Sequence, residues 1–340
     1  MKNVLLVGCG RIAGLNEDDL YRKKPCSHIG AYQAHPAYDV KGVFDINPKS
    51  CETFANKFGI LGRFNNIEKA LSEIKPELVS IAVPYDFNCE IVHLVAQHPN
   101  RPKMIFCEKP ISNSLKNAEN MVRVCEENKV LFYINNRRLT DIYNKLEEIY
   151  HRELDGEAIT VNAWCSSGLH AIGIHMIDLL RKIFGDIEWV RAKIEKEKVN
   201  TLPYSTNFKV DDPRVNAHIA FKNGIIGNFF NTALTTFTYF ELEVLCRKGK
   251  IRVSDNGNIL ELYKTRTPSR STLSYSLVRK KVFKTQNAET LFAKIAKELV
   301  HSNYDDCDHP LSAKHGLESY RVLDALIRSS ESEKTVWING

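Results

Sequence analysis

The stretch VLLVGCGRIA, residues 4–13, decides the fold of this chain. Its four leading apolar residues are typical of a parallel strand buried on both faces. Gly8 permits a sharp turn, Gly10 lets a pyrophosphate approach the backbone, and Ala13 is small enough for the next helix to pack close. The N-terminus of that helix points free N–H groups at the phosphates. We therefore predict a dinucleotide site here, although a tight turn in a flavodoxin-like fold without a nucleotide has the same pattern.

Bulk composition is that of an ordinary globular protein of two domains. The chain has 340 residues, a length at which one core normally splits into two. Its nine cysteines are scattered and form no CxxC pair, which suits a reducing cytoplasm better than a disulfide framework. The sequence contains no run of about 18 apolar residues, so we expect no membrane span.

The formal net charge of +6 comes largely from one stretch, residues 264–284, which contains no Asp or Glu. This stretch is either a solvated loop and strand face or a patch that attracts an anionic ligand or partner chain. We do not expect nucleic acid to be that partner, because no reader motif accompanies the charge.

Strand-like and helix-like segments alternate through the first 135 or so residues. This alternation predicts a Rossmann domain, residues 1–136, with a doubly wound parallel sheet and right-handed crossovers. After Arg138 the pattern changes to a helix, a strand, a second helix and then several strands joined by short turns, among them Lys222-Asn223-Gly224 and Asn256-Gly257-Asn258. We therefore predict a second, α+β domain, residues 137–340, with a large, mostly antiparallel open sheet.

Asp45 ends the second predicted strand, where a carboxylate can bind both hydroxyls of an adenosine ribose. The same charge repels a 2′-phosphate, so we expect NAD rather than NADP. Asp45 follows Ala13 by 32 residues, against a usual distance of roughly 20. A polar insertion at residues 15–27 explains the excess, with the helix resuming at about His28. The alternative is that Asp45 is only a turn residue.

Two further segments carry candidate catalytic groups. Lys109, in Cys107-Glu108-Lys109-Pro110, follows the fifth strand and so lies where open α/β sheets bind ligands. There it could act as a proton acceptor or donor. The alternative is that Lys109 is a surface lysine before a turn proline. His175 and Asp178 share one face of a later helix. A metal at His170, His175 and Asp178 is disfavoured, because their spacing matches no familiar ligand set. The segments Ala163–Gly168 and Asn135–Arg137 offer polar groups for a hydroxyl-rich ligand, or are simply loops.

Together, GCGRIA, the aspartate at the end of the second strand, CEKPIS at residues 107–112 and GIHMIDLL at residues 173–180 resemble the glucose–fructose oxidoreductase / inositol dehydrogenase (Gfo/Idh/MocA) family. The resemblance covers nearly the whole chain. It is strongest to members found with bacterial surface-polysaccharide genes. It implies an NAD(P)-dependent oxidoreductase acting on a sugar, cyclitol or nucleotide-sugar, in which Lys109 and His175 contact the reacting hydroxyl. The Lys109–Pro110 bond is a candidate for the cis form.

These readings give three groups of site residues. Lys109 and His175 are the expected catalytic pair. The expected cofactor-binding residues are Gly8, Gly10, Arg11, Ile12, Ala13, Asp45, Pro84, Glu108 and Lys109. The expected substrate-binding residues are Asn136, Arg137, Trp164, His170 and Asp178.

The sequence departs from the family pattern at two positions. Inositol dehydrogenase-like members have an aspartate four residues before the histidine, where this chain has Ala171. Many members have a TPxxxH stretch after the fourth strand, and here Asn88 replaces its histidine. The first departure weakens an inositol assignment, and His170 is a possible partial substitute.

The expected reaction is hydride transfer between NAD and a secondary alcohol of a sugar-like substrate. Two alternatives remain: an enzyme that keeps NAD tightly bound as a transient redox mediator for glycoside cleavage or sugar transfer, and a non-catalytic NAD and sugar sensor. The resemblance also implies a homodimer or homotetramer, formed through the open face of the second sheet.

Overall fold

The computed structural model describes residues 1–195, 212–232, 237–266, 275–285, 289–302 and 309–338. The chain divides into two compact units. The first unit comprises Met1–Leu139 and Glu289–Tyr320, and the second comprises Thr140–Ala288 and Arg321–Gly340. The expected boundary after residue 136 lies close to this division, but a segment near the C-terminus returns to the first unit.

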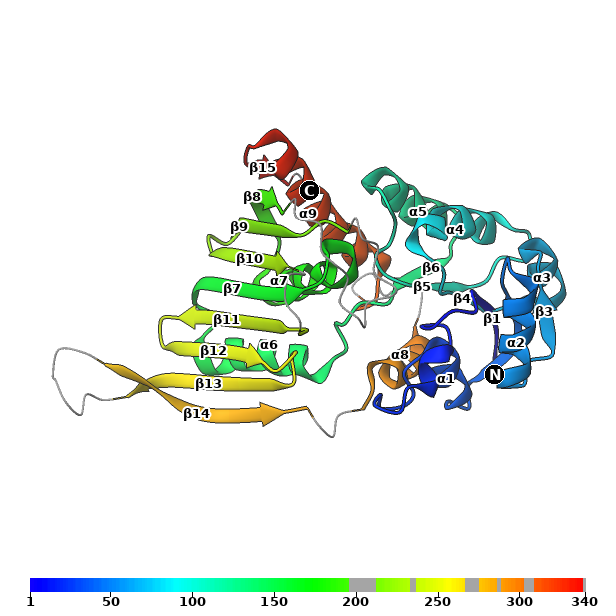
Figure 1. Ribbon diagram of the computed structural model, residues 1–340, viewed down its shortest axis with the longest axis horizontal. Coiled ribbons are helices and arrows are strands. Elements are labelled where there is room, and N and C mark those ends of the chain that lie inside the picture. Colours follow the sequence, from blue (N-terminus) through cyan, green and yellow to red (C-terminus); the bar gives the residue numbers. More distant parts are fainter. Residues whose placement is uncertain (196–211, 233–236, 267–274, 286–288, 303–308, 339–340) are drawn as a thin grey trace. The chain divides into compact units, whose positions relative to one another are not determined.

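Within residues 1–139, which are described throughout, six parallel strands form a sheet in the order β3-β2-β1-β4-β5-β6 (Figure 1). The strands are β1 (Lys2–Val7), β2 (Tyr38–Phe44), β3 (Gly62–Phe64), β4 (Leu78–Ile81), β5 (Met104–Cys107) and β6 (Leu131–Ile134). The order reverses direction at β1 and β4, which makes this the doubly wound sheet that the sequence predicts. The carboxyl ends of its strands, here called the carboxyl edge, carry the residues discussed below.

Within the described residues 1–139, five helices lie between these strands, and four of the five begin at a side-chain cap. They are α1 (His28–Gln33), α2 (Pro48–Phe58), α3 (Ile67–Ile74), α4 (Asn88–Gln97) and α5 (Leu115–Glu127), with short 3₁₀ turns at Leu15–Asp18 and Tyr85–Phe87. Asn47, Asn66 and Ser114 accept backbone N–H bonds at the starts of α2, α3 and α5.

The returning segment adds helix α8 (Leu291–His301) to the first unit. Ile295, Ala296 and Leu299 of α8 are buried in one cluster with Tyr32 of α1 and Phe106 of β5. The helix therefore covers the same face of the sheet as α1. Burial of this kind contributes about 25 cal/mol per Å² of apolar surface.

In the described part of the second unit, nine strands form a mixed sheet in the order β14-β13-β12-β11-β7-β10-β9-β8-β15. They are β7 (Ala158–Ser166), β8 (Ile187–Ile194), β9 (Val215–Phe221), β10 (Ile226–Thr232), β11 (Phe240–Cys246), β12 (Gly249–Ser254), β13 (Ile259–Arg266), β14 (Ser276–Lys284) and β15 (Val336–Trp337). Among the pairs of the described strands, β7–β10 is parallel and the others are antiparallel. This confirms the predicted mostly antiparallel sheet.

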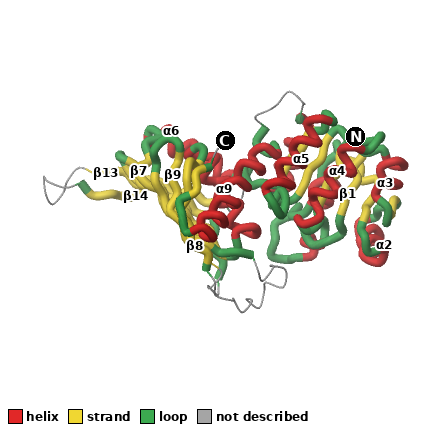
Figure 2. Tube along the Cα trace, turned by 90° about the horizontal axis from the view of Figure 1, so that it is seen from above, coloured by secondary structure: helices red, strands yellow, loops and turns green. Residues whose placement is uncertain are grey.

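Helices α6 (Asp141–Leu154) and α9 (Ala313–Ser332) lie beside the strands of this sheet (Figure 2). A third helix, α7 (Ile174–Phe184), directly follows a π-helical turn, Leu169–Gly173. Helix α9 begins in the first unit and continues into the second. Along β7, Val161, Ala163 and Cys165 are fully buried, and the alternate side chains point to the opposite face. None of the described helices is long and apolar enough to cross a membrane.

Candidate functional site

The glycine turn after β1 has the conformation that the motif requires. Gly8 has φ +99°, in the left-handed region, and a Cβ atom there would lie 2.6 Å from the Ala82 carbonyl oxygen. A Cβ atom on Gly10 would instead have no neighbour within 4 Å among the described residues. The backbone at Gly10 is therefore open to an approaching group, while Ala13 is completely buried beneath it.

Asp45 is tied to this turn by its side chain. One carboxylate oxygen, Oδ2, accepts a hydrogen bond from the Cys9 N–H at 2.9 Å. The other, Oδ1, accepts from the Asn47 N–H at 2.9 Å. A negative charge is thus fixed beside the glycine turn at the carboxyl edge. A left-handed Gly8, open space at Gly10 and a fixed carboxylate together fit the pyrophosphate and ribose of a dinucleotide.

The polar insertion interrupts a helix and then lets it continue. The carbonyls of Ile12 and Ala13 accept hydrogen bonds from the N–H groups of His28 and Ile29, at 3.1 and 2.9 Å. Helix α1 therefore stacks on the turn that contains the glycine motif, although 14 residues lie between Ala13 and His28 in the sequence. This explains why Asp45 is so far from the motif along the chain.

Glu17 holds the insertion in place. Its Oε1 atom accepts hydrogen bonds from the Cys26 N–H at 2.8 Å and from the Ser27 hydroxyl at 2.6 Å. A Cβ atom on Gly30 would lie only 2.1 Å from the same oxygen. The Glu17 carboxylate thus joins the insertion to the start of α1, while Leu20 and Tyr21 in the insertion are almost fully exposed.

A buried polar network lies next to Lys109. In the His28 ring, Nδ1 lies 2.7 Å from the Ser80 hydroxyl oxygen, and Nε2 lies 2.8 Å from a carboxylate oxygen of Glu108. Asn135 donates to the same Glu108 oxygen at 2.6 Å, and the Tyr32 hydroxyl donates to Ser80 at 2.9 Å. Glu108 thus turns inward, toward α1 and β6, and its Oε2 accepts from the Lys109 N–H at 3.3 Å. Sequence reasoning named Asn135 only as part of a polar segment and His28 only as the point where a helix resumes, and it did not predict their contacts with Glu108.

Burial would raise the pKa of the Glu108 carboxyl, but its partners more than offset this effect. Hydrogen bonds from His28 and Asn135 and the charge of Lys109 stabilise the ionised form, so the pKa lies below its ordinary value. The loop that carries Lys109 is therefore anchored to a buried carboxylate that is ionised at neutral pH.

Asn88, which replaces the histidine of the family pattern, has a position in this loop. Its amide nitrogen lies 3.3 Å from each of the carbonyl oxygens of Glu108, Pro110 and Ile111. The Lys109–Pro110 peptide is cis, as expected. Asn88 therefore contacts the backbone on both sides of Lys109.

His175 is at the start of α7 in the second unit. It is buried, as is Asp178 one turn later, and its backbone carbonyl accepts a hydrogen bond from the Tyr143 hydroxyl of α6 at 3.3 Å. His170, in the preceding π-helical turn, has its Nδ1 atom 2.9 Å from a carboxylate oxygen of Asp212. Asp212 comes from far along the chain, and no sequence motif indicated it. Among the described residues, no three His, Cys, Asp or Glu side chains gather as a metal site.

Comparisons with known proteins agree with this geometry. Residues 2–136 match the model of the oxidoreductase family with an NAD-binding Rossmann fold (GFO_IDH_MocA), and residues 155–252 match the C-terminal domain model of the same family. The chain belongs to the Gfo/Idh/MocA oxidoreductase family. NAD binding by a Rossmann domain is thus a family property, and the corresponding sequence resemblance is confirmed.

Individual relatives of this Gfo/Idh/MocA protein are distant. D-apiose dehydrogenase of Rhizobium rhizogenes is 24% identical over 50% of this chain and 55% of its own length. Glucose-6-phosphate 3-dehydrogenase of Bacillus subtilis is 28% identical over 57% and 58%. The matches span little more than half of these curated relatives. The WlbA dehydrogenase of Bordetella pertussis, solved with NADH and UDP-GlcNAcA, has a TM-score of 0.77 at 18% identity, covering 100% and 99% of the two chains. This similarity shows the shared fold.

The other candidate residues of this Gfo/Idh/MocA protein are distributed as follows. In the first unit, Pro84 is exposed at the end of β4, and Asn136 is buried with its amide donating to the Pro310 carbonyl at 3.0 Å. In the second unit, Trp164 stacks on Phe230 across the β7–β10 pair, with ring centres 6.2 Å apart. Arg11 and Ile12 belong to the glycine turn, and Arg137 follows Asn136.

The candidate catalytic residues belong to different units: Lys109 to the first and His175 to the second. The structure brings Gly8, Asp45 and Lys109 to the carboxyl edge of one sheet. It also brings His170 and His175 to the start of one helix.

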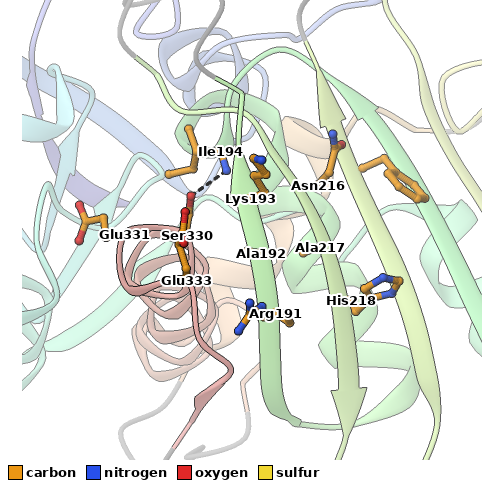
Figure 3. Close-up of a pocket in the computed structure, with 11 residues that line it drawn as sticks. Arg191, Ala192, Lys193, Ile194, Asn216, Ala217, His218, Ser330, Glu331 and Glu333 are labelled. Carbon is orange, nitrogen blue, oxygen red and sulfur yellow. Dashed lines mark hydrogen bonds between the residues drawn. The ribbon is translucent and has the colours of Figure 1, made fainter.

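A separate hollow in the second unit involves none of the predicted site residues (Figure 3). It lies over β8, β9 and β10 beside the end of α9, where Ile194 N–H donates to the Ser330 hydroxyl at 2.8 Å. Its polar lining includes Arg191, Lys193, Asn216, His218, Ser330, Glu331 and Glu333. We assign it no part in the chemistry.

Proposed function

We propose that this protein is an NAD-dependent oxidoreductase that oxidises or reduces a secondary alcohol of a sugar, cyclitol or nucleotide-sugar. The observation that carries the proposal is the common position of the glycine turn, Asp45 and Lys109 at the carboxyl edge of the first sheet. Ligands of open α/β sheets bind at this edge. Bound NAD would supply the hydride acceptor, held by Gly8, Gly10 and Asp45.

Asp45 favours NAD over NADP. Its carboxylate is fixed by two backbone N–H groups and cannot easily turn away. A 2′-phosphate in the same place would meet a like charge at short range. We therefore infer NAD as the physiological cofactor.

The protein's own contribution to the reaction is proton transfer and orientation. In this proposal, the Lys109 amine exchanges a proton with the substrate hydroxyl, and His175 is the partner or alternative base that the family resemblance implies. Proton transfer from a positioned group is worth roughly 10²–10⁴ in rate. The names of the relatives, which include dehydrogenases of apiose and glucose 6-phosphate, support a sugar-like substrate.

Replacing Lys109 tests this role. Lys109→Ala should lower turnover at least about a hundredfold, because the proton acceptor is lost. The dissociation constant for NAD should change little, as measured by calorimetry. Lys103→Ala is the matched control, because Lys103 lies in the same unit just before β5 with its side chain 81% exposed. Equal turnover in Lys109→Ala and Lys103→Ala would refute the role.

We also propose that the protein acts in the cytoplasm as a homodimer or homotetramer, assembled through the sheet face that carries Trp164 and Phe230. That stacked aromatic pair is only partly buried in the single chain. Sedimentation equilibrium of the purified protein tests the assembly, and a monomer at micromolar concentration would contradict it.

A further inference from the structure

The π-helical turn before α7 is capped by a carboxylate that comes from another part of the second unit. Asp212 lies just before β9. Its Oδ1 atom accepts a hydrogen bond from the His170 N–H, and its Oδ2 atom accepts from the Ala171 N–H, both at 2.9 Å. The nearby Leu169 N–H donates to the Pro213 carbonyl at 2.8 Å. Two chain segments about 40 residues apart are thus joined at the start of the helix that carries His175.

This approach requires a glycine. A Cβ atom on Gly168 would lie 2.0 Å from Cγ of Asp212 and 2.2 Å from its Oδ2. Gly168 has φ −84° and ψ 174°, which any residue adopts, so its backbone conformation alone does not demand glycine. What demands it is the space that the Asp212 carboxylate occupies.

Asp212 also contacts the His170 side chain, which capping the helical turn does not require. Its Oδ1 atom is 2.9 Å from Nδ1 of the His170 ring, in addition to the backbone bonds. The two side chains are only 13% and 8% exposed, so water weakens this contact little. The carboxylate accepts from the ring, which places the proton of a neutral imidazole on Nδ1 and makes Nε2 the acceptor atom.

We propose that Asp212 is a positioning residue that fixes the ring and the tautomer of His170, so that His170 Nε2 accepts a hydrogen bond from a hydroxyl of the sugar-like substrate. This inference deepens the proposed function and rests on it. The carboxylate that Ala171 does not supply on its own side chain reaches this turn from Asp212 instead. A hydroxyl-bearing ligand is the suitable partner, because a neutral imidazole nitrogen accepts from O–H donors.

The first test observes the tautomer directly. Protein labelled with ¹⁵N-histidine gives distinct ring-nitrogen resonances for the two neutral tautomers, and a His170→Gln variant assigns the His170 signals. We expect the Nδ1-protonated tautomer in the wild type and its loss, or a mixture of tautomers, in Asp212→Asn. Asp186→Asn is the control, since Asp186 follows the opposite end of α7 and pairs with Arg181. A wild-type His170 ring protonated on Nε2 would overturn the proposal.

The second test measures kinetics with NAD and a substrate drawn from a panel of sugars, cyclitols and nucleotide-sugars. Asp212→Asn should raise KM for that substrate by up to about tenfold, the scale of losing one hydrogen bond between neutral groups, with a smaller change in kcat. The dissociation constant for NAD should stay the same. An unchanged KM in Asp212→Asn would overturn the substrate role of His170, even if the tautomer had changed.

Gly168→Ala provides a variant that alters neither side chain of the pair. It should displace the Asp212 carboxylate and reproduce both the tautomer change and the higher KM, with near-normal far-ultraviolet circular dichroism. Normal values of both in Gly168→Ala would contradict the proposal. Failure of the proposed function has a different signature, namely that the wild type reduces NAD with no member of the panel, whereas failure of this inference leaves wild-type turnover intact.

Discussion

His28 shows how much one side chain connects at the carboxyl edge. Its backbone N–H bonds to the Ile12 carbonyl of the glycine turn, while its ring reaches the Glu108 carboxylate beside Lys109. The ring is completely buried. The glycine turn and the lysine loop, nearly 100 residues apart in the sequence, are therefore held through one imidazole.

Removing the His28 ring should leave a buried carboxylate short of a partner. We expect His28→Leu to lower the free energy of unfolding by about 3 kcal/mol, because the buried Glu108 carboxylate loses one of its hydrogen-bond donors. Urea denaturation measures this loss.

Tyr32→Phe is the control for the same network. It removes only the hydroxyl that bonds to Ser80 and should cost about 1 kcal/mol. A His28→Leu variant as stable as Tyr32→Phe would show that Glu108 does not depend on the imidazole.

The site residues that the sequence predicted are those with local signals. Gly8 and Gly10 follow an apolar strand, and Asp45 ends the next one. His28 and Asp212 lacked such signals, because their partners, Glu108 and His170, are 80 and 42 residues away along the chain. A contact of that kind is made by the fold, and a single sequence without its structure does not indicate it.

At the scale of elements, the insertion between Ala13 and His28 is the feature most particular to this chain. Glu17 fastens it to the start of α1. Its tip contains Tyr21, which is fully exposed, followed by Arg22. The hydrogen bonds of Glu17 are therefore among the contacts that hold the insertion, together with the ion pair between Lys57 and Asp18.

Glu17→Ala should loosen the insertion without unfolding the protein. We expect trypsin to cleave after Arg22 several times faster than in the wild type, because proteolysis follows local opening. Glu17→Gln, which keeps an acceptor oxygen for the Cys26 N–H, should lie between the two. Equal cleavage rates in all three proteins would mean that Glu17 does not hold the segment.

The β13–β14 hairpin extends beyond the neighbouring strands of its sheet (Figure 1). Strand β14 lies within the acid-free stretch, and most of its side chains are exposed, so no apolar alternation marked it in the sequence. Lys264 and Lys281 both donate to Glu153 of α6, at 2.6 Å. Arg279 pairs with Glu261 at 2.8 Å, and Arg270 lies outside the described residues. Part of the positive charge of residues 264–284 is therefore paired with acidic side chains of the same chain.

The Glu153 contacts predict a pH dependence. Hydrogen bonds from Lys264 and then Lys281 lower the pKa of Glu153 from 4.5 to about 2. A lowered pKa in the folded state contributes stability that is present above the unfolded value and is lost as the pH falls through the folded value. The stability difference between wild type and Glu153→Gln should therefore be present at neutral pH and vanish near pH 2.

Thermal unfolding across that pH range checks this expectation. Lys281→Gln should show a smaller difference with the same pH dependence, because Lys264 still donates to Glu153. Lys280→Gln is the control, since Lys280 has no acidic partner within the described residues. A difference that grew as the pH fell would have the wrong sign for the account.

At the scale of the whole molecule, the fold class of each unit was predictable, because strand–helix alternation and hairpin turns depend on residues that are close together in the sequence. The return of α8 to the first unit was not, since its amphipathic pattern suits either sheet. It was decided by packing against Tyr32 and Phe106. Family membership then links the two units to one class of chemistry, redox reactions with NAD.

The insertion beside the glycine turn also suits a competing function, in which the enzyme retains NAD between reaction steps. An enzyme that retains NAD as a transient redox mediator needs a segment that slows its release, and residues 15–27 follow directly after the motif. The two functions differ in the fate of the reduced cofactor: a dehydrogenase releases NADH, and a mediator enzyme reoxidises it before release.

The most direct measurement is therefore the appearance of free NADH. Purified protein is mixed with excess NAD and, in turn, with sugars, cyclitols and nucleotide-sugars, and the absorbance of reduced nicotinamide is followed. We predict that at least one of these compounds yields many equivalents of NADH per chain, and that NADP in place of NAD gives a much slower reaction. NADH limited to one equivalent per chain, or none with any of these compounds, would contradict the account.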